Sequence, residues 1–264
     1  MYHFDWPVFV RYLWPPDALQ NPLIRNGLAA TILMSIIAQV LGVILGLFAA
    51  LGKMSKFPLS RGAAEIYILY FRGTPVLVQM VLFYYGLGVT HIYDFPDIHL
   101  FGIVIPGALQ AATLALGINE GAYMAEIVRA GIEAIDLGQM EAAKSLGMTY
   151  GQAMRRIILP QAAKVIVPPL GNEFNNMMKT TSLAVVISGA ELFYAYEQIN
   201  ANLFKPFELF LAASLYYLVL TTIWTFIQSW IESGLGERKG AEKQPGMFQR
   251  LIGGHPIAAE RGGH

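Results

Sequence analysis

The chain has 264 residues, of which 55% are hydrophobic and only 14% are charged, and its formal net charge is zero. Because soluble domains carry about 25% charged residues, this composition excludes an ordinary soluble domain and indicates an integral membrane protein. A zero net charge gives no basic surface of the kind that nucleic-acid binding requires. The absence of cysteine excludes disulfides, thiolate zinc sites and cysteine nucleophiles.

Apolar tracts long enough to cross about 30 Å of hydrocarbon recur along the sequence. They predict an all-α integral membrane protein with about five transmembrane helices, at about 27–51, 63–88, 107–132, 163–190 and 206–231. Residues 1–23 then form an N-terminal segment, residues 24–232 the transmembrane domain and residues 233–264 a tail. The tail is rich in glycine and charge and is predicted to be disordered.

The first two predicted spans carry residues that affect helix packing and helix continuity. Gly42 and Gly46 have the GxxxG spacing that lets two helices approach closely, although a glycine-rich helix also gives this spacing by chance. Pro75 removes a backbone donor, so the second span is expected to kink or break there. Two interpretations of Arg72 remain open. Either Arg72 and the freed carbonyls serve an anionic group, or Arg72 neutralises an acidic residue on a neighbouring helix.

The third predicted span places Asn119, Tyr123, Glu126 and Arg129 on nearly one helix face. Ionisable residues inside a membrane are costly, so they are candidates for a functional site. The favoured interpretation of Glu126 and Arg129 is an ion pair at i and i+3 near the cytoplasmic end. The alternative is that this face lines the path of a polar solute.

Residues 136–160 form a charged insertion in an otherwise apolar chain. Gly147 suits the left-handed residue that ends a helix. Thr149 followed by Gln152 is a capping-box pattern, which predicts a new helix from about Tyr150. The sequence therefore predicts a short polar helix, a sharp turn and a helix that enters the membrane. Such an elbow faces a soluble partner.

A polar stripe marks the fourth predicted span. Its side chains recur at i, i+3, i+4 and i+7, which places them on one helix face. Lipid cannot satisfy them, so the face is expected to look onto other helices or an aqueous cavity. We favour a lining for the path of a polar solute over a set of interhelical hydrogen bonds. The stripe comprises Asn172, Asn175, Asn176 and Lys179, widened by Glu173, Thr180 and Ser182.

Basic residues predict the orientation of the chain, because positively charged loops stay on the cytoplasmic side. Only Arg11, Arg25 and Lys205 fall in one set of loops, whereas the opposite set and the tail are rich in lysine and arginine. The N-terminus is therefore predicted to lie outside the membrane and the C-terminus on the cytoplasmic side. The elbow is then cytoplasmic, and the loop 91–102 lies outside.

Several motifs of enzymes are missing. No G-x-x-x-x-G-K-[S/T] phosphate loop occurs, so the chain is not expected to bind ATP in that manner. The five histidines show no metal-ligand spacing, and no G-x-S-x-G nucleophile elbow is present. The sequence therefore predicts neither catalytic residues nor a metal site.

Seven residues of the elbow match the E-A-A-x3-G-x9-I-x-L-P signature of permease subunits of bacterial ATP-binding-cassette (ABC) importers. The chain therefore resembles this family, and four more stretches are similar to its polar-amino-acid branch: 71–79, 122–132, 168–174 and 179–183. The resemblance covers about residues 24–232. One departure is that Thr180 stands where many members of this branch carry an aspartate after the lysine. The signature positions are Glu141, Ala142, Ala143, Gly147, Ile157, Leu159 and Pro160.

The resemblance implies the type I importer permease fold and a set of partners. A coupling helix at about 141–146 would sit in a groove on a separate cytoplasmic ATPase dimer, and the small side chains of Ala142 and Ala143 would allow close approach. A second permease subunit would complete the path, and a periplasmic binding protein would deliver an amino acid. ATP and magnesium would bind to the ATPase, so no cofactor is expected in this chain. The implied coupling residues are Glu141, Ala142, Ala143, Ser145 and Gly147.

The expected function is thus ATP-driven import of a polar or charged L-amino acid across the bacterial inner membrane. Glu173 can complement an ammonium group, and Arg72 or Lys179 a carboxylate, which suits a zwitterion. Glu173 favours basic amino acids, unless it neutralises one of those cations instead. The predicted pathway residues are Arg72, Tyr123, Glu126, Asn172, Glu173, Asn176, Lys179, Thr181 and Ser182. The alternatives are an ion-coupled secondary transporter or channel, and a structural or receptor subunit without substrate flux.

Overall fold

The computed structural model describes residues 3–100 and 102–234. Its elements are α1 (Trp6–Leu13), α2 (Pro15–Ala18), α3 (Pro22–Lys53), α4 (Pro58–Gly73), α5 (Val76–Val81), the π turn η1 (Leu82–Gly86), α6 (Leu87–Val89), β1 (Ile98–Leu100), β2 (Ile103–Ile105), α7 (Gly107–Glu133), α8 (Leu137–Ser145), α9 (Tyr150–Ala153), the π turn η2 (Met154–Ile158), α10 (Leu159–Thr180), the 3-10 helix η3 (Thr181–Ile187), α11 (Leu192–Leu203) and α12 (Pro206–Gly234). The predicted tail lies almost wholly outside the described residues.

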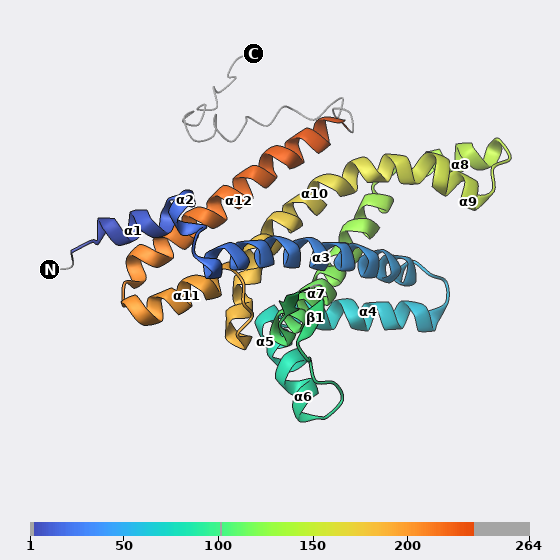
Figure 1. Cartoon of the computed structure of the whole chain (residues 1–264). Coiled ribbons are helices and arrows are strands. Elements are labelled where there is room, and N and C mark those ends of the chain that lie inside the picture. The colour runs from blue at the N-terminus through green and yellow to red at the C-terminus, as the bar shows by residue number, and fades with distance from the viewer. Residues whose placement is uncertain (1–2, 101, 235–264) are drawn as a thin grey trace, which may run out of the picture.

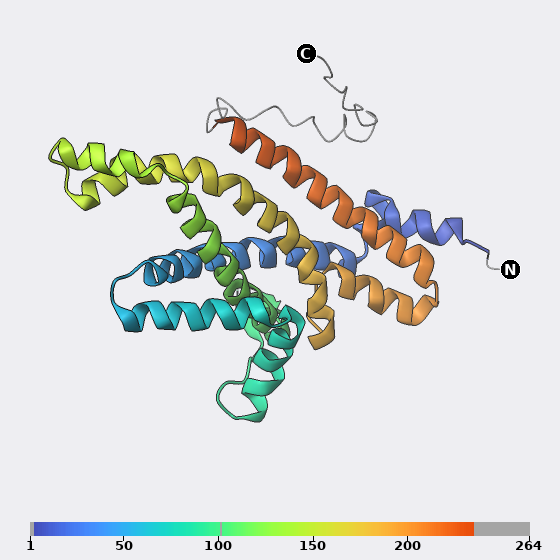
Figure 2. The ribbon, with the colours of Figure 1, turned by 180° about the vertical axis from the view of Figure 1, so that it is seen from behind.

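The helices form a bundle with its two ends clearly distinguished (Figure 1). The α8–α9 hairpin lies at one end, and α1 lies at the opposite end with the turn between α11 and α12. Figure 2 shows the same arrangement from behind. Prolines begin α2, α3, α4 and α12, where a missing backbone donor costs nothing. Asn21 caps α3 by accepting a hydrogen bond from the Leu23 amide at 3.0 Å.

Helix α7 lies at the centre and packs most extensively against α3. Both glycines of the predicted packing motif lie at this contact. A Cβ atom on Gly42 would come within 2.5 Å of Cγ of Glu120, and one on Gly46 would come within 2.9 Å of the Ala125 backbone nitrogen. The close helix approach predicted from the GxxxG spacing is therefore confirmed.

The second predicted span breaks at Pro75, as expected. Helix α4 ends at Gly73, and Pro75 caps the start of α5 in an extended conformation. The helical pair turns through 106° at this break. The resulting corner, rather than a continuous helix, contributes one wall of the cavity described below.

The fourth predicted span, 163–190, is wrong as a single helix. Helix α10 ends at Thr180, and the chain continues as η3 to Ser188, which has a left-handed backbone with φ of 61°. Glu191 then caps a further helix, α11, by accepting a hydrogen bond from the Tyr194 amide at 2.8 Å. The short antiparallel pair β1–β2 in the loop before α7 was not predicted either.

Within residues 3–100 and 102–234, length and composition qualify two helices, α3 and α12, as membrane spans, or three if the bent α4–α6 segment counts as one. Helices α7 and α10 carry more polar residues, and α7 is covered by neighbouring helices along much of its length. A helix shielded from lipid does not need an apolar surface all round. The count of five spans stays a prediction.

Candidate functional site

A polar cavity of about 820 Å³ opens between the corner at Pro75, the middle of α7 and the end of α10. Segments distant in sequence meet there because the chain turns through 106° between α4 and α5, and α5 packs against α7 and η3. We call it the central cavity. Its lining comprises Arg72, Gly73, Thr74, Pro75, Val76, Leu116, Asn119, Glu120, Tyr123, Glu173, Asn176, Met177, Lys179, Thr180, Ser182 and Leu183.

Charges of both signs line the central cavity. The cationic groups are Arg72 and Lys179, and both residues are exposed. The anionic groups are Glu173, which is half-buried, and Glu120, which is only 6% exposed. The cavity thus offers separate partners for a carboxylate and an ammonium group within one enclosure.

Arg72 lies over the ring of Tyr123, with its guanidinium carbon 5.3 Å from the ring centroid, a cation–π geometry. It forms no ion pair with any residue in the described ranges, so it does not neutralise an acidic neighbour.

The carbonyls freed by the Pro75 break already have partners. Phe71 and Thr74 each accept a hydrogen bond at 3.1 Å from the Gln79 side chain. Asn119 donates a further bond to the Phe71 carbonyl at 2.7 Å. These carbonyls therefore brace the corner against α7. Arg72 remains the group at this corner that can bind an anion.

The polar stripe of α10 divides between two surroundings. Asn176 and Lys179 line the cavity together with Glu173. Asn172 instead accepts a hydrogen bond from Gln228 at 3.2 Å, and Asn175 donates to the Thr221 carbonyl of α12 at 3.3 Å.

The cavity face of α10 thus coincides with the predicted stripe only in part. Ser182, just beyond α10, also lines the cavity. Thr181 is fully buried and donates to the Met178 carbonyl, so the structure places neither Thr181 nor Asn172 on the cavity wall.

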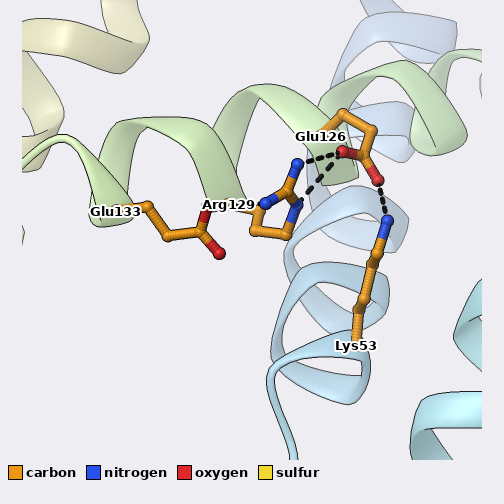
Figure 3. Close-up of polar contacts among 4 residues, drawn as sticks. All are labelled: Lys53, Glu126, Arg129 and Glu133. Atoms are coloured by element: carbon orange, nitrogen blue, oxygen red, sulfur yellow. Dashed lines mark hydrogen bonds and ion pairs between the residues drawn. The ribbon is translucent and has the colours of Figure 1, made fainter.

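Glu126 lies outside the central cavity, in an ion-pair cluster at the end of α3 and α7 (Figure 3). Its carboxylate contacts Lys53 at 2.5 Å and Arg129 at 2.7 Å, which confirms the predicted pair with Arg129. Arg129 also contacts Glu133 at 2.6 Å. The cluster joins the last residue of α3 to the part of α7 that leads into α8.

A second cavity, of about 500 Å³, lies beside this cluster. It shares Arg72, Gly73 and Tyr123 with the central cavity, and Lys53 and Glu126 also line it. The stacked Arg72–Tyr123 pair therefore lies on the boundary between the two cavities. Glu126 reaches only the second one.

The elbow (residues 136–160) has the two helices and the turn that its sequence predicts. Asp136 caps the start of α8, and Gly147 lies just beyond the end of α8 with a left-handed φ of 78°. The amides of Gly147 and Met148 bond to the carbonyls of Lys144 and Ala143 at 2.9 and 3.1 Å, which is the Schellman arrangement. The reciprocal capping box of Thr149 and Gln152 is present, and α9 begins at Tyr150.

The helical path then continues from α9 through η2 into α10. Pro160 lacks a donor, and its ring would collide with the Arg156 carbonyl in a regular helix. The wider π turn lies just before it, with the Leu159 amide bonded to the Met154 carbonyl. The elbow is therefore joined to α10 by continuous helical backbone, without a flexible loop.

The exposed surface of the elbow differs in one respect from the predicted docking surface. Glu141, Ala142 and Ser145 are exposed, but Ala143 is only 3% exposed and packs inside the elbow. Ala143 is thus an internal packing residue, and its assignment to the outer surface is corrected. Large apolar side chains are exposed beside that surface: Leu137 at 80%, Leu146 at 83% and Tyr150 at 61%.

Replacing Gly147 with alanine is expected to destabilise the elbow by about 1 kcal/mol, because an L side chain is disfavoured at positive φ. No atom lies within 4 Å of the added Cβ, so strain alone acts. Thermal unfolding of the purified complex measures the effect. Gly151→Ala is the matched control, since Gly151 has equally open space without positive φ, and its stability should not fall. Equal effects in both variants would contradict the role of Gly147.

The prediction missed Glu120 altogether, although it is an ionisable residue inside an apolar span, which is the criterion that selected Glu126. The prediction also omitted Leu137, Leu146 and Tyr150. Their signal is visible in the sequence as apolar side chains within a charged insertion. Among the described residues, no group of His, Asp or Glu gathers to hold a metal ion; the expectation of no metal site stays a prediction.

Comparison with known proteins gives consistent matches. Residues 42–237 match the family model described as "Binding-protein-dependent transport system inner membrane component". The chain is 40% identical to the arginine transport system permease protein ArgU of Corynebacterium glutamicum, over 87% of this chain and 71% of that protein. It is 38% identical to the probable glutamine ABC transporter permease protein GlnM of Bacillus subtilis, over 74% and 85% respectively.

A solved structure is also similar over nearly the whole described chain. The structure described as an amino acid ABC transporter with histidines shares 39% identity and superposes with a TM-score of 0.75. The match covers 88% of this chain and 99% of the solved one. The similarity in fold is therefore accompanied by similarity in sequence.

Proposed function

The chain belongs to the binding-protein-dependent transport system inner membrane component family, as an amino-acid permease subunit of an ABC importer, and we propose that its central cavity conducts a polar or charged L-amino acid. A separate ATPase dimer drives this transport from the elbow. The chain itself is a transport component and not an enzyme. ATP and magnesium bind to the ATPase and not to this chain.

The observation that supports this proposal best is the pairing of opposite charges in the central cavity. A free amino acid always carries a carboxylate and an ammonium group. Arg72 and Lys179 suit the first, and Glu173 and Glu120 suit the second. Charge-assisted hydrogen bonds of this kind are about twice as strong as neutral ones. The cavity of about 820 Å³ is also large enough for such a solute.

The elbow supports the second part of the proposal. Its exposed apolar side chains, Leu137, Leu146 and Tyr150, lie on the same short segment as the exposed Glu141 and Ala142. Exposed apolar groups rimmed by polar ones are typical of a protein-binding surface. Because α9, η2 and α10 form one helical path, a displacement of the elbow moves Glu173 and Lys179 as well.

The remaining partners follow from the same proposal. The permease domain comprises residues 24–232. A second permease subunit, identical or related, completes the wall of the path, and a periplasmic binding protein delivers the amino acid at the end opposite the elbow. The chain lies in the inner membrane with its N-terminus periplasmic and its C-terminus cytoplasmic, in line with the distribution of lysine and arginine.

Two conservative changes test the central cavity. Lys179→Met and Glu173→Gln are each expected to lower ATP-driven uptake at least about tenfold, because each removes one charge-assisted contact. Uptake into proteoliposomes measures this, and the yield of assembled complex serves as the reference. Glu197→Gln is the control, because Glu197 is an exposed residue of α11 outside the cavity. Asn175→Asp would not serve, because Asn175 contacts α12. Unchanged transport by both cavity variants would contradict the proposal.

A further inference from the structure

Glu120 is a buried carboxylate on the wall of the central cavity. We propose that it is the specificity-determining residue of the permease and binds the positively charged side-chain group of a basic amino acid. This inference rests on the proposed function, because it names the substrate class that the same cavity admits.

The position of Glu120 is held by close packing. It lies on α7, and its Cγ would be 2.5 Å from a Cβ atom placed on Gly42 of α3. Any larger residue at position 42 would occupy the space that the Glu120 side chain now fills. The glutamate therefore packs closely against α3 while it lines the cavity, with only 6% of its surface exposed.

One oxygen of this carboxylate lacks a partner within the chain. The Oε1 atom of Glu120 is buried and accepts no hydrogen bond from any described residue. An unsatisfied buried acceptor is costly, and a charged one more so. A cationic group of a bound solute would supply the missing donor and charge together.

The distribution of charge sets the orientation of the solute. Glu173 and Glu120 both line the central cavity, so two acidic side chains face the same solute. Arg72 and Lys179 are exposed, whereas Glu120 is buried. A basic amino acid fits this arrangement of charges with its carboxylate near the exposed cations Arg72 and Lys179 and its side chain toward the buried Glu120.

A neutral amino acid leaves one anion of the cavity without a partner. Its single ammonium group can complement Glu173 or Glu120, but not both. A basic amino acid brings two cationic groups for the two carboxylates and one carboxylate for the cations. The second, buried acid therefore selects for the additional positive charge.

The test compares two ligands of nearly equal shape, arginine and citrulline, which differ in the charge of the side-chain end group. Binding of each radiolabelled ligand is measured on the purified complex of permease and ATPase, without a binding protein. In Glu120→Gln, arginine affinity should fall at least about tenfold, while citrulline affinity should change less than about threefold. Glu197→Gln, an exposed glutamate of α11, should change neither.

Each other outcome overturns the inference. If Glu120→Gln leaves arginine binding unchanged, Glu120 does not bind the charged end of the substrate side chain. If both ligands weaken equally, Glu120 acts in folding or packing. If the wild-type complex binds arginine and citrulline equally, the selection is absent. If the wild-type complex binds neither, the central cavity is not the substrate path, and the proposed function fails with it.

Discussion

Replacing Gly46 with leucine should strongly destabilise the folded permease, because α3 and α7 cannot approach each other as closely with a side chain at that position. Even a Cβ atom there would lie 2.9 Å from the Ala125 backbone nitrogen and from the Gly121 carbonyl oxygen. Backbone atoms cannot rotate away as a side-chain end can, so the two helices must separate. Overpacking of this kind costs about 3 kcal/mol, and more where a helix contact is lost.

Thermal unfolding of the detergent-purified protein measures this effect, with an expected fall of at least about 6 °C. Gly62→Leu provides the matched control, since Gly62 of α4 has no atom within 4 Å of an added Cβ. Leucine is also a better helix former than glycine, so the control should be no less stable than the wild type. A Gly46 variant as stable as this control would contradict the packing account.

Replacing Ala142 with phenylalanine is expected to uncouple ATP hydrolysis from uptake. Ala142 is exposed on α8 beside Glu141, at the centre of the proposed docking surface. A bulky ring there prevents close approach of the ATPase groove, and a lost contact at an interface centre costs about 2 kcal/mol or more. ATP-driven uptake should therefore fall at least about tenfold, while the amount of inserted permease stays unchanged.

The structure determines how this experiment is designed. Ala143 must be left alone, because it is buried inside the elbow and its replacement would test folding instead. Ala201→Phe is the matched control: Ala201 is an exposed alanine on α11, at the end of the molecule opposite the elbow. The amount of amino acid transported per ATP hydrolysed is the measured quantity. A normal ratio in Ala142→Phe would remove the elbow from the coupling pathway.

The elbow was predictable because each of its signals is local. The capping box needs only Thr149 and Gln152, three residues apart, and the turn needs only a residue that tolerates positive φ, Gly147. The break at Pro75 is equally local, since it follows from a missing donor and a fixed ring. Such features do not depend on where the rest of the chain lies.

The cavity face of α10 was less predictable because it depends on a neighbouring helix. Periodicity correctly placed Asn172 and Asn176 one turn apart. It could not show that Gln228 of α12 bonds to the first of them and leaves only the second for the cavity. The end of α10 at Thr180 is a similar case, because no glycine or proline in residues 181–188 marks it in the sequence.

Glu120 shows a different limit. A carboxylate between apolar residues is visible in the sequence, but that it shares one cavity with Glu173 is not, since the two lie on different helices far apart in the chain. Only the packing of α7 between α3 and α10 brings them to one cavity. The sequence therefore identified that charges lie in the membrane, and the fold shows which of them act together.

Uptake into proteoliposomes tests the central claim most directly. The chain is reconstituted with its ATPase and binding protein, and in parallel without either, and accumulation of a labelled amino acid is followed with ATP or with an imposed ion gradient. We expect accumulation only when the ATPase, the binding protein and ATP are all present. Gradient-driven flux through the chain alone would instead identify a secondary transporter or channel and contradict the account.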